Sequence, residues 1–217
     1  MTPILYDFWR SSAAYRVRIV LNLKQVAYES VAVDLTKGAQ RNPAFLARNP
    51  QGLVPALDIG STVLTQSLAI IDYLDATHER VPMVSSDPVA RSHVLAQALV
   101  IAADIHPIDN LRVLNRLTAQ FGADQAARDA WYTHWIIEGL TALEAMTADL
   151  PGPFLGGDAP NLADVCLIPQ LYNARRFAVP LDRFPRLLRA DAAAAERPEI
   201  VAAHPDRVRP GDATPQA

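Results

Sequence analysis

Two short polar segments stand where helices are expected to begin. The first, Ser11 and Ser12, follows Arg10 at the end of an expected strand, and the second, Gln66 and Ser67, opens a later helix. The N-terminus of a helix carries free backbone N–H groups and a partial positive charge, so hydroxyl groups there favour an anion such as a thiolate or a carboxylate. Ordinary helix capping is the simpler explanation of each pair in isolation, because serine is a common N-cap residue.

Metal chemistry is not indicated by the sequence. The chain contains one cysteine, Cys166, and five histidines that are far apart along the chain. One cysteine forms neither an intramolecular disulfide nor a multi-cysteine zinc site, and scattered histidines form no local ligand cluster. We therefore expect no bound metal. Cys166 stands between two apolar residues of an expected helix, which is typical of a small buried apolar side chain.

The composition argues against two further classes of protein. The 217 residues include 20 Lys and Arg against 23 Asp and Glu, so there is no basic surplus for binding a phosphate backbone. No apolar run approaches the roughly 18 residues that a membrane span needs, and the N-terminus lacks a basic segment followed by an apolar one. We therefore expect a soluble, cytoplasmic protein that binds neither nucleic acid nor membrane.

The two polar segments belong to an expected α/β domain at 1–80. Patterns of apolar residues predict strands at 3–8, 28–33, 53–57 and 62–64 and helices at 12–24 and 66–74. A strand–helix–strand unit this compact requires its two strands to be parallel, with a right-handed crossover. In the first helix, Arg16 and Arg18 are expected to lie partly off the apolar face.

The rest of the chain is expected to be helical. Pro, Ser and Asp residues at 81–87 indicate a linker, after which the helical domain covers 88–200, with helices at 88–120, 124–149, 161–176 and 184–197. Pro107 should bend or interrupt the first of these helices, and Pro169 should do the same in the third. Prolines with small and charged neighbours indicate a loosely ordered tail at 201–217.

Six sequence blocks together resemble one family. They are RSSAAYRVRI at 10–19, NPQGLVPAL at 49–57, QSLAI at 66–70, DIHP at 104–107, NLRVL at 110–114 and LADVCLIPQLYNARRF at 162–177. The blocks resemble the cytosolic glutathione transferases over about residues 3–200. They are most similar to the zeta class, the glutathione-dependent maleylacetoacetate isomerases and their maleylpyruvate isomerase relatives. The resemblance implies an α/β plus all-α fold, with a thioredoxin-like N-terminal domain and a helical C-terminal domain.

The resemblance also implies an activity and its cofactor. In this class the thiolate of glutathione adds to the cis double bond of maleylacetoacetate, the resulting single bond rotates, and elimination gives fumarylacetoacetate. This isomerisation belongs to the catabolism of aromatic amino acids, including tyrosine degradation. The expected partners are therefore glutathione, a small-molecule dicarboxylate substrate, and a second copy of the chain in a homodimer.

The resemblance assigns the glutathione contacts residue by residue. The backbone of Val54, held by a cis Pro55, pairs with the cysteinyl part of glutathione like an added strand. Polar side chains make the other contacts: Ser11 and Ser12 at the thiolate, Gln40 near the glycine end, Gln66 and Ser67 at the γ-glutamyl carboxylate, and Asp104 at the γ-glutamyl amine in the partner subunit, with His106 beside it. For Asp104 and His106, a structural role as a cap or core pair stays open.

Arginines are implied on the substrate side. The resemblance places Arg10, Arg112 and Arg176 around the substrate pocket, where planar guanidinium groups bind carboxylates through two hydrogen bonds. Arg10 is expected to act with the two serines in catalysis. Arg175, the neighbour of Arg176, is expected to be solvated or salt-bridged instead.

One position departs from the family pattern. The zeta class often has a cysteine where this chain has Ala13. Glutathione brings its own thiol, so isomerisation does not require that cysteine. The alanine removes one candidate contact, and Cys166 does not replace it. Asp164, three residues after Asn161, is typical of a capping box and is expected to serve folding.

Three other functions stay open at this point. They are maleylpyruvate isomerase, a general glutathione transferase acting on electrophiles, and a non-catalytic transferase-like module for protein interaction. The sequence does not separate the two isomerases. Ser11, Gln66 and Ser67 argue against the interaction module, because such a module needs no glutathione contacts.

Overall fold

The chain divides into two compact units. The computed structural model describes residues 1–210. Unit 1 combines Met1–Met83 with the C-terminal stretch that starts at Ala195, and unit 2 consists of Val84–Ala194. The first unit is therefore built from both ends of the chain, whereas the sequence predicted a first domain that ends at residue 80 and a helical domain that runs to residue 200.

Unit 1 contains a mixed sheet of four strands in the order β2-β1-β3-β4. Strands β1 (Ile4–Asp7) and β2 (Glu29–Ala32) are parallel, and α1 (Ser12–Leu23) connects them. Strand β3 (Ala56–Asp58) is antiparallel to both β1 and β4 (Val63–Thr65). The expected strand–helix–strand unit and the hairpin that follows it are confirmed.

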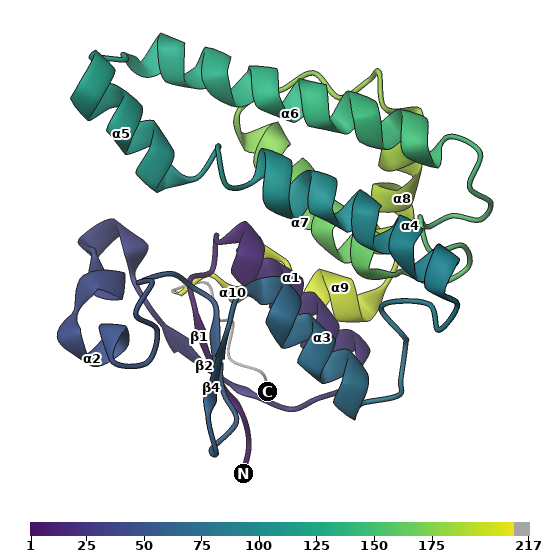
Figure 1. Cartoon of the computed structure of the whole chain (residues 1–217), viewed down its shortest axis with the longest axis horizontal. Helices are drawn as coiled ribbons and strands as arrows, with labels where there is room; N and C mark the ends of the chain where they lie inside the picture. Colours follow the sequence, from purple (N-terminus) through teal and green to yellow (C-terminus); the bar gives the residue numbers. More distant parts are fainter. Residues whose placement is uncertain (211–217) are drawn as a thin grey trace. The chain divides into compact units, whose positions relative to one another are not determined.

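Helices cover both faces of this sheet. Figure 1 shows α1 and α3 (Ser67–Thr77) together on one face, and the short α2 (Pro43–Leu46) on the other side. On the α2 side, Tyr6 of β1 meets Phe45 edge to face, with ring centroids 6.1 Å apart. Phe45 belongs to a buried apolar cluster whose other members are Phe8, Val33 and Val54. The 3₁₀ turns Leu35–Lys37 and Ala39–Arg41 lead into α2.

Apart from an isolated β-bridge between Phe154 and Gly157, the regular elements of unit 2 are all helices. Its elements are α4 (Pro88–Leu99), the π-helical turn η3 (Val100–Ile105), α5 (Leu111–Phe121), α6 (Gln125–Thr147), α7 (Leu162–Arg176) and α8 (Pro185–Ala195), the last of which ends at the unit boundary. The interruption expected at Pro107 is confirmed, since η3 ends just before it. A bend or an interruption was expected at Pro169, and the interruption is wrong: α7 continues through this residue, because burial on nearly all sides stabilises a helix that has lost one backbone hydrogen bond.

The start of α7 confirms the expected structural role of Asp164. Asn161 and Asp164 form a capping box in which each side chain bonds the backbone of the other. The carboxylate also accepts hydrogen bonds from the backbone N–H groups of Leu155 (2.8 Å) and Gly156 (3.0 Å). Asp164 therefore ties the loop before α7 to the helix start.

The segment after α8 returns to unit 1 as two short helices. They are α9 (Pro198–Ala202), which packs against α1, and α10 (Pro205–Val208). Asn22 of α1 donates a hydrogen bond to the carbonyl oxygen of Glu199, at 2.9 Å. The sequence predicted a loosely ordered tail at 201–217; residues 201–208 are instead largely helical, and 211–217 lie outside the described residues.

A buried arginine joins three parts of unit 1. Arg18 of α1 was expected partly off the apolar face, yet the residue is almost completely buried. Its Nη1 donates to both carboxylate oxygens of Asp7 at 2.8 Å, and its Nη2 donates to the carbonyl oxygen of Trp9 at 2.9 Å. Its Nε donates to the carbonyl oxygen of Ala203 at 3.0 Å. Arg18 therefore connects strand β1, helix α1 and the returning C-terminal segment.

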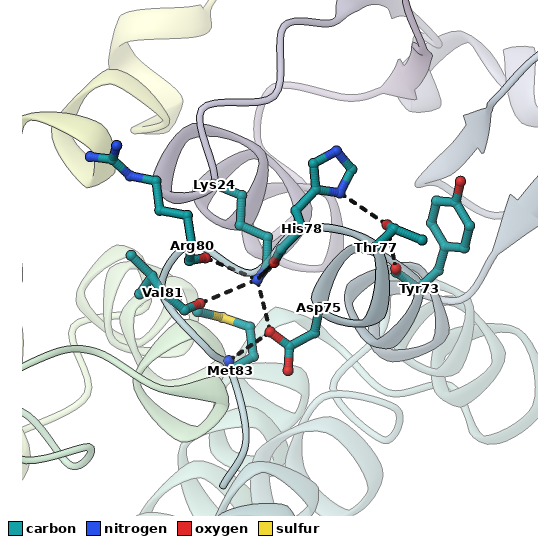
Figure 2. A network of polar contacts seen from close by, with 8 residues as sticks. All are labelled: Lys24, Tyr73, Asp75, Thr77, His78, Arg80, Val81 and Met83. Atoms are coloured by element: carbon teal, nitrogen blue, oxygen red, sulfur yellow. Dashed lines mark hydrogen bonds and ion pairs between the residues drawn. The ribbon is translucent and has the colours of Figure 1, made fainter. Parts of the chain in front are cut away.

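A buried lysine fixes the end of the N-terminal stretch, as Figure 2 shows. The side chain of Lys24 is 0% exposed, and its Nζ donates to Asp75 Oδ1 at 2.8 Å. Its other acceptors are backbone carbonyl oxygens after α3, those of His78 (2.8 Å), Arg80 (3.0 Å) and Val81 (3.3 Å). Asp75 Oδ1 also accepts from the backbone N–H of Met83, at 2.9 Å. Lys24 thus holds the segment by which the chain leaves unit 1.

Candidate active site

The start of α1 places a hydroxyl group at the helix N-terminus. Ser11 is the N-cap, and its Oγ accepts a hydrogen bond from the backbone N–H of Ala14 at 3.3 Å. A serine Oγ that accepts from an N–H group keeps its own hydrogen to donate. Capping and anion binding are therefore compatible roles for Ser11. Ser12, the first residue of the helix, is buried.

Arg10 precedes these serines against aromatic rings. Its guanidinium carbon lies 5.3 Å from the ring centroid of Trp9 and 6.0 Å from that of Phe8. The indole of Trp9 is also 5.2 Å from the guanidinium carbon of Arg209 in the returning segment. Arg10 is therefore held beside the helix start by ring contacts, which keep its positive charge near Ser11.

The turn before β3 has the cis bond that the resemblance implied. The Val54–Pro55 peptide bond is cis. Asn49, which is buried, donates from Nδ2 to the carbonyl oxygen of Leu53 at 2.7 Å, and its Oδ1 accepts from the backbone N–H of Gln51 at 3.1 Å. Asn49 therefore fixes the turn that leads into Val54. This role was not predicted from the sequence, although an asparagine that opens an Asn-Pro turn is a recognised signal for such bonds.

The start of α3 lacks the kind of side-chain cap that five other helices have. Side chains cap α1, α4, α5, α6 and α7, whereas the N-cap of α3, Gln66, makes no side-chain cap. Gln66 instead donates from Nε2 to Gln51 Oε1 at 2.8 Å, and its backbone has a left-handed φ of 68°. Such a conformation costs about 1–3 kcal/mol and often occurs at binding sites. The backbone N–H groups at this helix start are suited to a carboxylate.

Ser67 links the two helix starts. It is buried, and its Oγ lies 3.5 Å from Nη1 of Arg16, which projects from α1. The buried guanidinium of Arg16 adds positive charge beside the expected carboxylate position. Arg16 was expected partly off the apolar face, with no role in the site, because the spacing of apolar residues does not show where a long polar side chain ends.

Gln40 supplies a buried acceptor. Its Oε1 is buried and has no hydrogen-bond partner within the described part of the chain. Glutathione offers amide N–H groups, a thiol and two carboxylates, so an amide acceptor together with two helix N-termini and hydroxyl donors fits this tripeptide. Unit 1 therefore contains all five residues to which the resemblance assigns glutathione contacts: Ser11, Gln40, Val54, Gln66 and Ser67.

The other expected site residues belong to unit 2. Asp104 is exposed on η3, and His106 directly follows this turn and is half-buried. Arg112 is exposed in the first turn of α5, where its backbone N–H is capped by Asn110 Oδ1 at 3.1 Å. Arg176 is exposed in the last turn of α7. Arg175 pairs with Asp191 of α8, as expected for a salt-bridged position.

Unit 2 also contains a buried acid that the sequence analysis missed. Asp109 is 7% exposed, and within the described part of the chain neither of its carboxylate oxygens has a hydrogen-bond partner. Burial raises the pKa of Asp109 to about 8. Burial and the charge of Asp109 both raise the pKa of Tyr132. No pattern in the sequence marks this aspartate, because its neighbourhood is made by residues distant along the chain.

Replacing Asp109 with asparagine is expected to stabilise the protein increasingly as pH rises. The carboxyl has a pKa near 3.8 when unfolded and about 8 when folded. Between these values the folded state holds a proton that the unfolded state has lost, so wild-type stability falls as pH rises, by at most about 1.4 kcal/mol per pH unit. Urea denaturation at pH 5, 7 and 9 measures this; a difference between the two proteins that does not change with pH would contradict it.

No group of three or more potential metal ligands occurs among residues 1–210. The same residues contain no helix that is both long enough and apolar enough to span a membrane.

Comparison with known proteins identifies the family. The glutathione S-transferase N-terminal domain model matches residues 1–76, and the C-terminal domain model matches residues 125–195. A maleylacetoacetate isomerase of Rhizobium meliloti is 51% identical over 95% of this chain and 98% of its own length. The chain therefore belongs to the glutathione S-transferase family.

Two solved structures place the chain within that family. A zeta-class maleylpyruvate isomerase has a TM-score of 0.93 and 45% identity, covering 97% of this chain and 100% of its own. A maleylacetoacetate isomerase of Methylobacterium extorquens AM1, solved with malonate and GSH bound, has a TM-score of 0.91 and 40% identity, with the same coverage. The chain is thus similar to zeta-class maleylacetoacetate and maleylpyruvate isomerases, as the sequence blocks predicted.

Proposed function

We propose that this protein is a glutathione-dependent cis–trans isomerase that converts maleylacetoacetate to fumarylacetoacetate in aromatic amino-acid catabolism. The observation that carries the proposal is the 51% identity to a maleylacetoacetate isomerase along nearly the whole of both chains. The site geometry supports it, because a helix N-terminus with a hydroxyl suits a thiolate and exposed arginines suit a dicarboxylate.

The residues of unit 1 hold glutathione and activate it. When bound, glutathione supplies the thiolate that adds reversibly to the cis double bond and so permits rotation. Ser11 and Ser12 donate hydrogen bonds to the thiolate, and the N-terminus of α1 and the charge of Arg10 lower the pKa of the thiol below its ordinary value of about 8.5. The remaining unit 1 contacts orient the tripeptide: the Val54 backbone, Gln40, Gln66 and Ser67.

The residues of unit 2 act on the substrate and on a second subunit. Arg112 and Arg176, with Arg10, bind the carboxylates of the substrate and stabilise the negative charge that develops on it during addition. Asp104 reaches the γ-glutamyl amine of glutathione in the second subunit of a homodimer, with His106 beside it.

An absorbance assay tests the proposed function directly. Consumption of maleylacetoacetate is followed with and without glutathione, and the expected result is turnover only when glutathione is present. Equal rates under both conditions would overturn the proposal. Failure of the protein to bind a glutathione column, together with no turnover, would favour a non-catalytic interaction module.

Maleylpyruvate is the alternative substrate. The similarity to a maleylpyruvate isomerase, at 45% identity and a TM-score of 0.93, favours it as the second candidate. Comparing kcat/KM for the two acids separates these functions. High turnover of uncharged electrophiles with neither acid as substrate would instead indicate a general glutathione transferase.

The assembly and the compartment are further parts of the proposal. A symmetric homodimer is the commonest closed arrangement and lets Asp104 serve the neighbouring site; sedimentation near 24 kDa, the mass of one chain, would contradict it.

A cytoplasmic location agrees with the need for reduced glutathione, which buffers thiols in the cytosol. Imaging of a fluorescent fusion checks this location.

Replacing Arg176 with lysine is expected to raise KM for the dicarboxylate while leaving glutathione affinity nearly unchanged. Lysine keeps the charge but loses the planar fork that binds a carboxylate through two hydrogen bonds. Activity toward an uncharged electrophile should fall far less, since it presents no carboxylate. Steady-state kinetics on both substrates measure the split; equal losses on both would show that Arg176 supports the fold or the thiolate.

A further inference from the structure

Arg176 is held from two sides by uncharged groups. Its Nη1 donates a hydrogen bond to Asn173 Oδ1 at 3.0 Å, one turn earlier on α7. Its guanidinium carbon also lies 5.7 Å from the ring centroid of Phe177. A guanidinium group has five N–H donors, so one bond to Asn173 leaves most of them for a ligand.

Both of these contacts rest on one buried side chain of α6. The hydroxyl of Tyr132 accepts a hydrogen bond from Asn173 Nδ2. The ring of Tyr132 stacks on Phe177, with centroids 3.8 Å apart and planes inclined by 18°. Tyr132 is almost completely buried and therefore has little freedom to move. It thus supports the amide and the ring that touch Arg176.

The amide of Asn173 can have only one orientation in this arrangement. A guanidinium group only donates hydrogen bonds, so the amide oxygen must face Arg176. The amide nitrogen then faces Tyr132, whose hydroxyl oxygen must accept. The chain of contacts from Tyr132 through Asn173 to Arg176 is therefore directional, and it ends in guanidinium donors.

We propose that Tyr132 and Asn173 are positioning residues that aim the Arg176 guanidinium at a substrate carboxylate. The inference rests on the proposed function, in which Arg176 binds that carboxylate. An arginine side chain that is held before the ligand arrives loses less conformational entropy on binding, which strengthens recognition.

The charges around the two neighbouring arginines support this assignment. Arg175 pairs with the carboxylate of Asp191, which neutralises its charge. Arg176 is held by an amide and a ring, so its full charge is kept for an anion. Asp109, whose charge would act on Tyr132, keeps its proton up to about pH 8 because it is buried.

Malonate binding by calorimetry, with the full chain and glutathione present, tests the positioning. Asn173→Ala and Tyr132→Phe are each expected to weaken malonate binding about threefold to tenfold, the range for one lost hydrogen bond, with glutathione affinity unchanged. In an Arg176→Ala background the same changes should have no further effect. Arg175→Ala is the matched control and should bind malonate like the wild type.

Asn173→Asp separates positioning from simple packing. Aspartate keeps an oxygen for Arg176 and can accept from the Tyr132 hydroxyl, but its charge neutralises the guanidinium. Malonate binding should therefore be at least as weak as in Asn173→Ala. Wild-type affinity in this variant would overturn the inference, because a merely structural asparagine would tolerate it.

The remaining outcomes separate the positioning role of Tyr132 and Asn173 from the carboxylate-binding role of Arg176. If the losses of malonate affinity in the Asn173 and Tyr132 variants add fully to the loss in Arg176→Ala, the two residues act independently of Arg176. That result would overturn the positioning role. No loss in Arg176→Ala itself would overturn the carboxylate role on which the inference rests. If Tyr132→Phe does not fold, the two Asn173 variants decide. If the wild-type protein binds malonate but isomerises neither acid, the proposed reaction is overturned, while the positioning of Arg176 is still tested by the variants.

Discussion

Replacing Ser11 with alanine is expected to lower kcat by about 10²- to 10³-fold while glutathione binding changes little. A donor that acts on the reacting charge contributes roughly 2.7–4 kcal/mol to the transition state. Gln66, Ser67 and the Val54 backbone would still hold the tripeptide. Stopped-flow titration of the bound thiol and steady-state kinetics measure both effects. An unchanged kcat would transfer the thiolate role to Ser12.

The capping role of Ser11 calls for a second variant. Ser11→Ala also removes the bond to the Ala14 N–H, and the loss of an N-cap costs about 1 kcal/mol of stability. Ser11→Asp keeps a capping oxygen but loses the hydroxyl donor and adds a negative charge. Its thermal stability should match the wild type while kcat stays low. Recovery of kcat in Ser11→Asp would show that the alanine variant fails through the cap.

Replacing Lys24 with methionine is expected to destabilise the protein by about 3–5 kcal/mol. Methionine keeps much of the aliphatic volume but leaves the Asp75 carboxylate and three backbone carbonyls without their shared donor. Removing one partner of a buried ion pair leaves an uncompensated charge, which is strongly destabilising. The free energy of unfolding in urea measures the loss.

The chain supplies its own control, because its second lysine is on the surface. The side chain of Lys37 is 83% exposed and lies 3.7 Å from Asp34. Lys37→Met should change stability by no more than about 0.5 kcal/mol. Adding Asp75→Asn to Lys24→Met should recover part of the loss, because the buried charge is then gone. Equal effects of the two lysine substitutions would refute the assigned role of Lys24.

The architecture of unit 1 was predictable to the level of strands and helices. Alternating apolar residues and the compact spacing of the first elements predicted the parallel pair β1 and β2, and both are present. The buried ions were not predictable in this way. Arg18 and Lys24 find partners far along the chain, at Ala203 and Asp75, and residue type alone assigns such side chains to the surface.

The candidate site was predictable where it lies in local sequence blocks. Ser11, Val54 and Gln66 occupy the helix starts and the turn that the blocks predicted. Their catalytic and binding roles stay predictions until the variants are measured. Asp109 and Tyr132 were missed, because their importance comes from burial and from contacts between α6, α7 and the segment before α5, which no local pattern contains.

The return of the C-terminal segment to unit 1 sets the order in which the protein can be completed during synthesis. A chain emerges from the ribosome with its N-terminus first, and an N-terminal domain usually folds before the next one is made. Here the third anchor of the Arg18 guanidinium, the Ala203 carbonyl, leaves the ribosome only after all of unit 2. Unit 1 therefore begins to emerge first, but its fold is completed only after unit 2 has been synthesised. A nascent chain that stops before residue 195 would leave the face of α1 that receives α9 open to water or to chaperones.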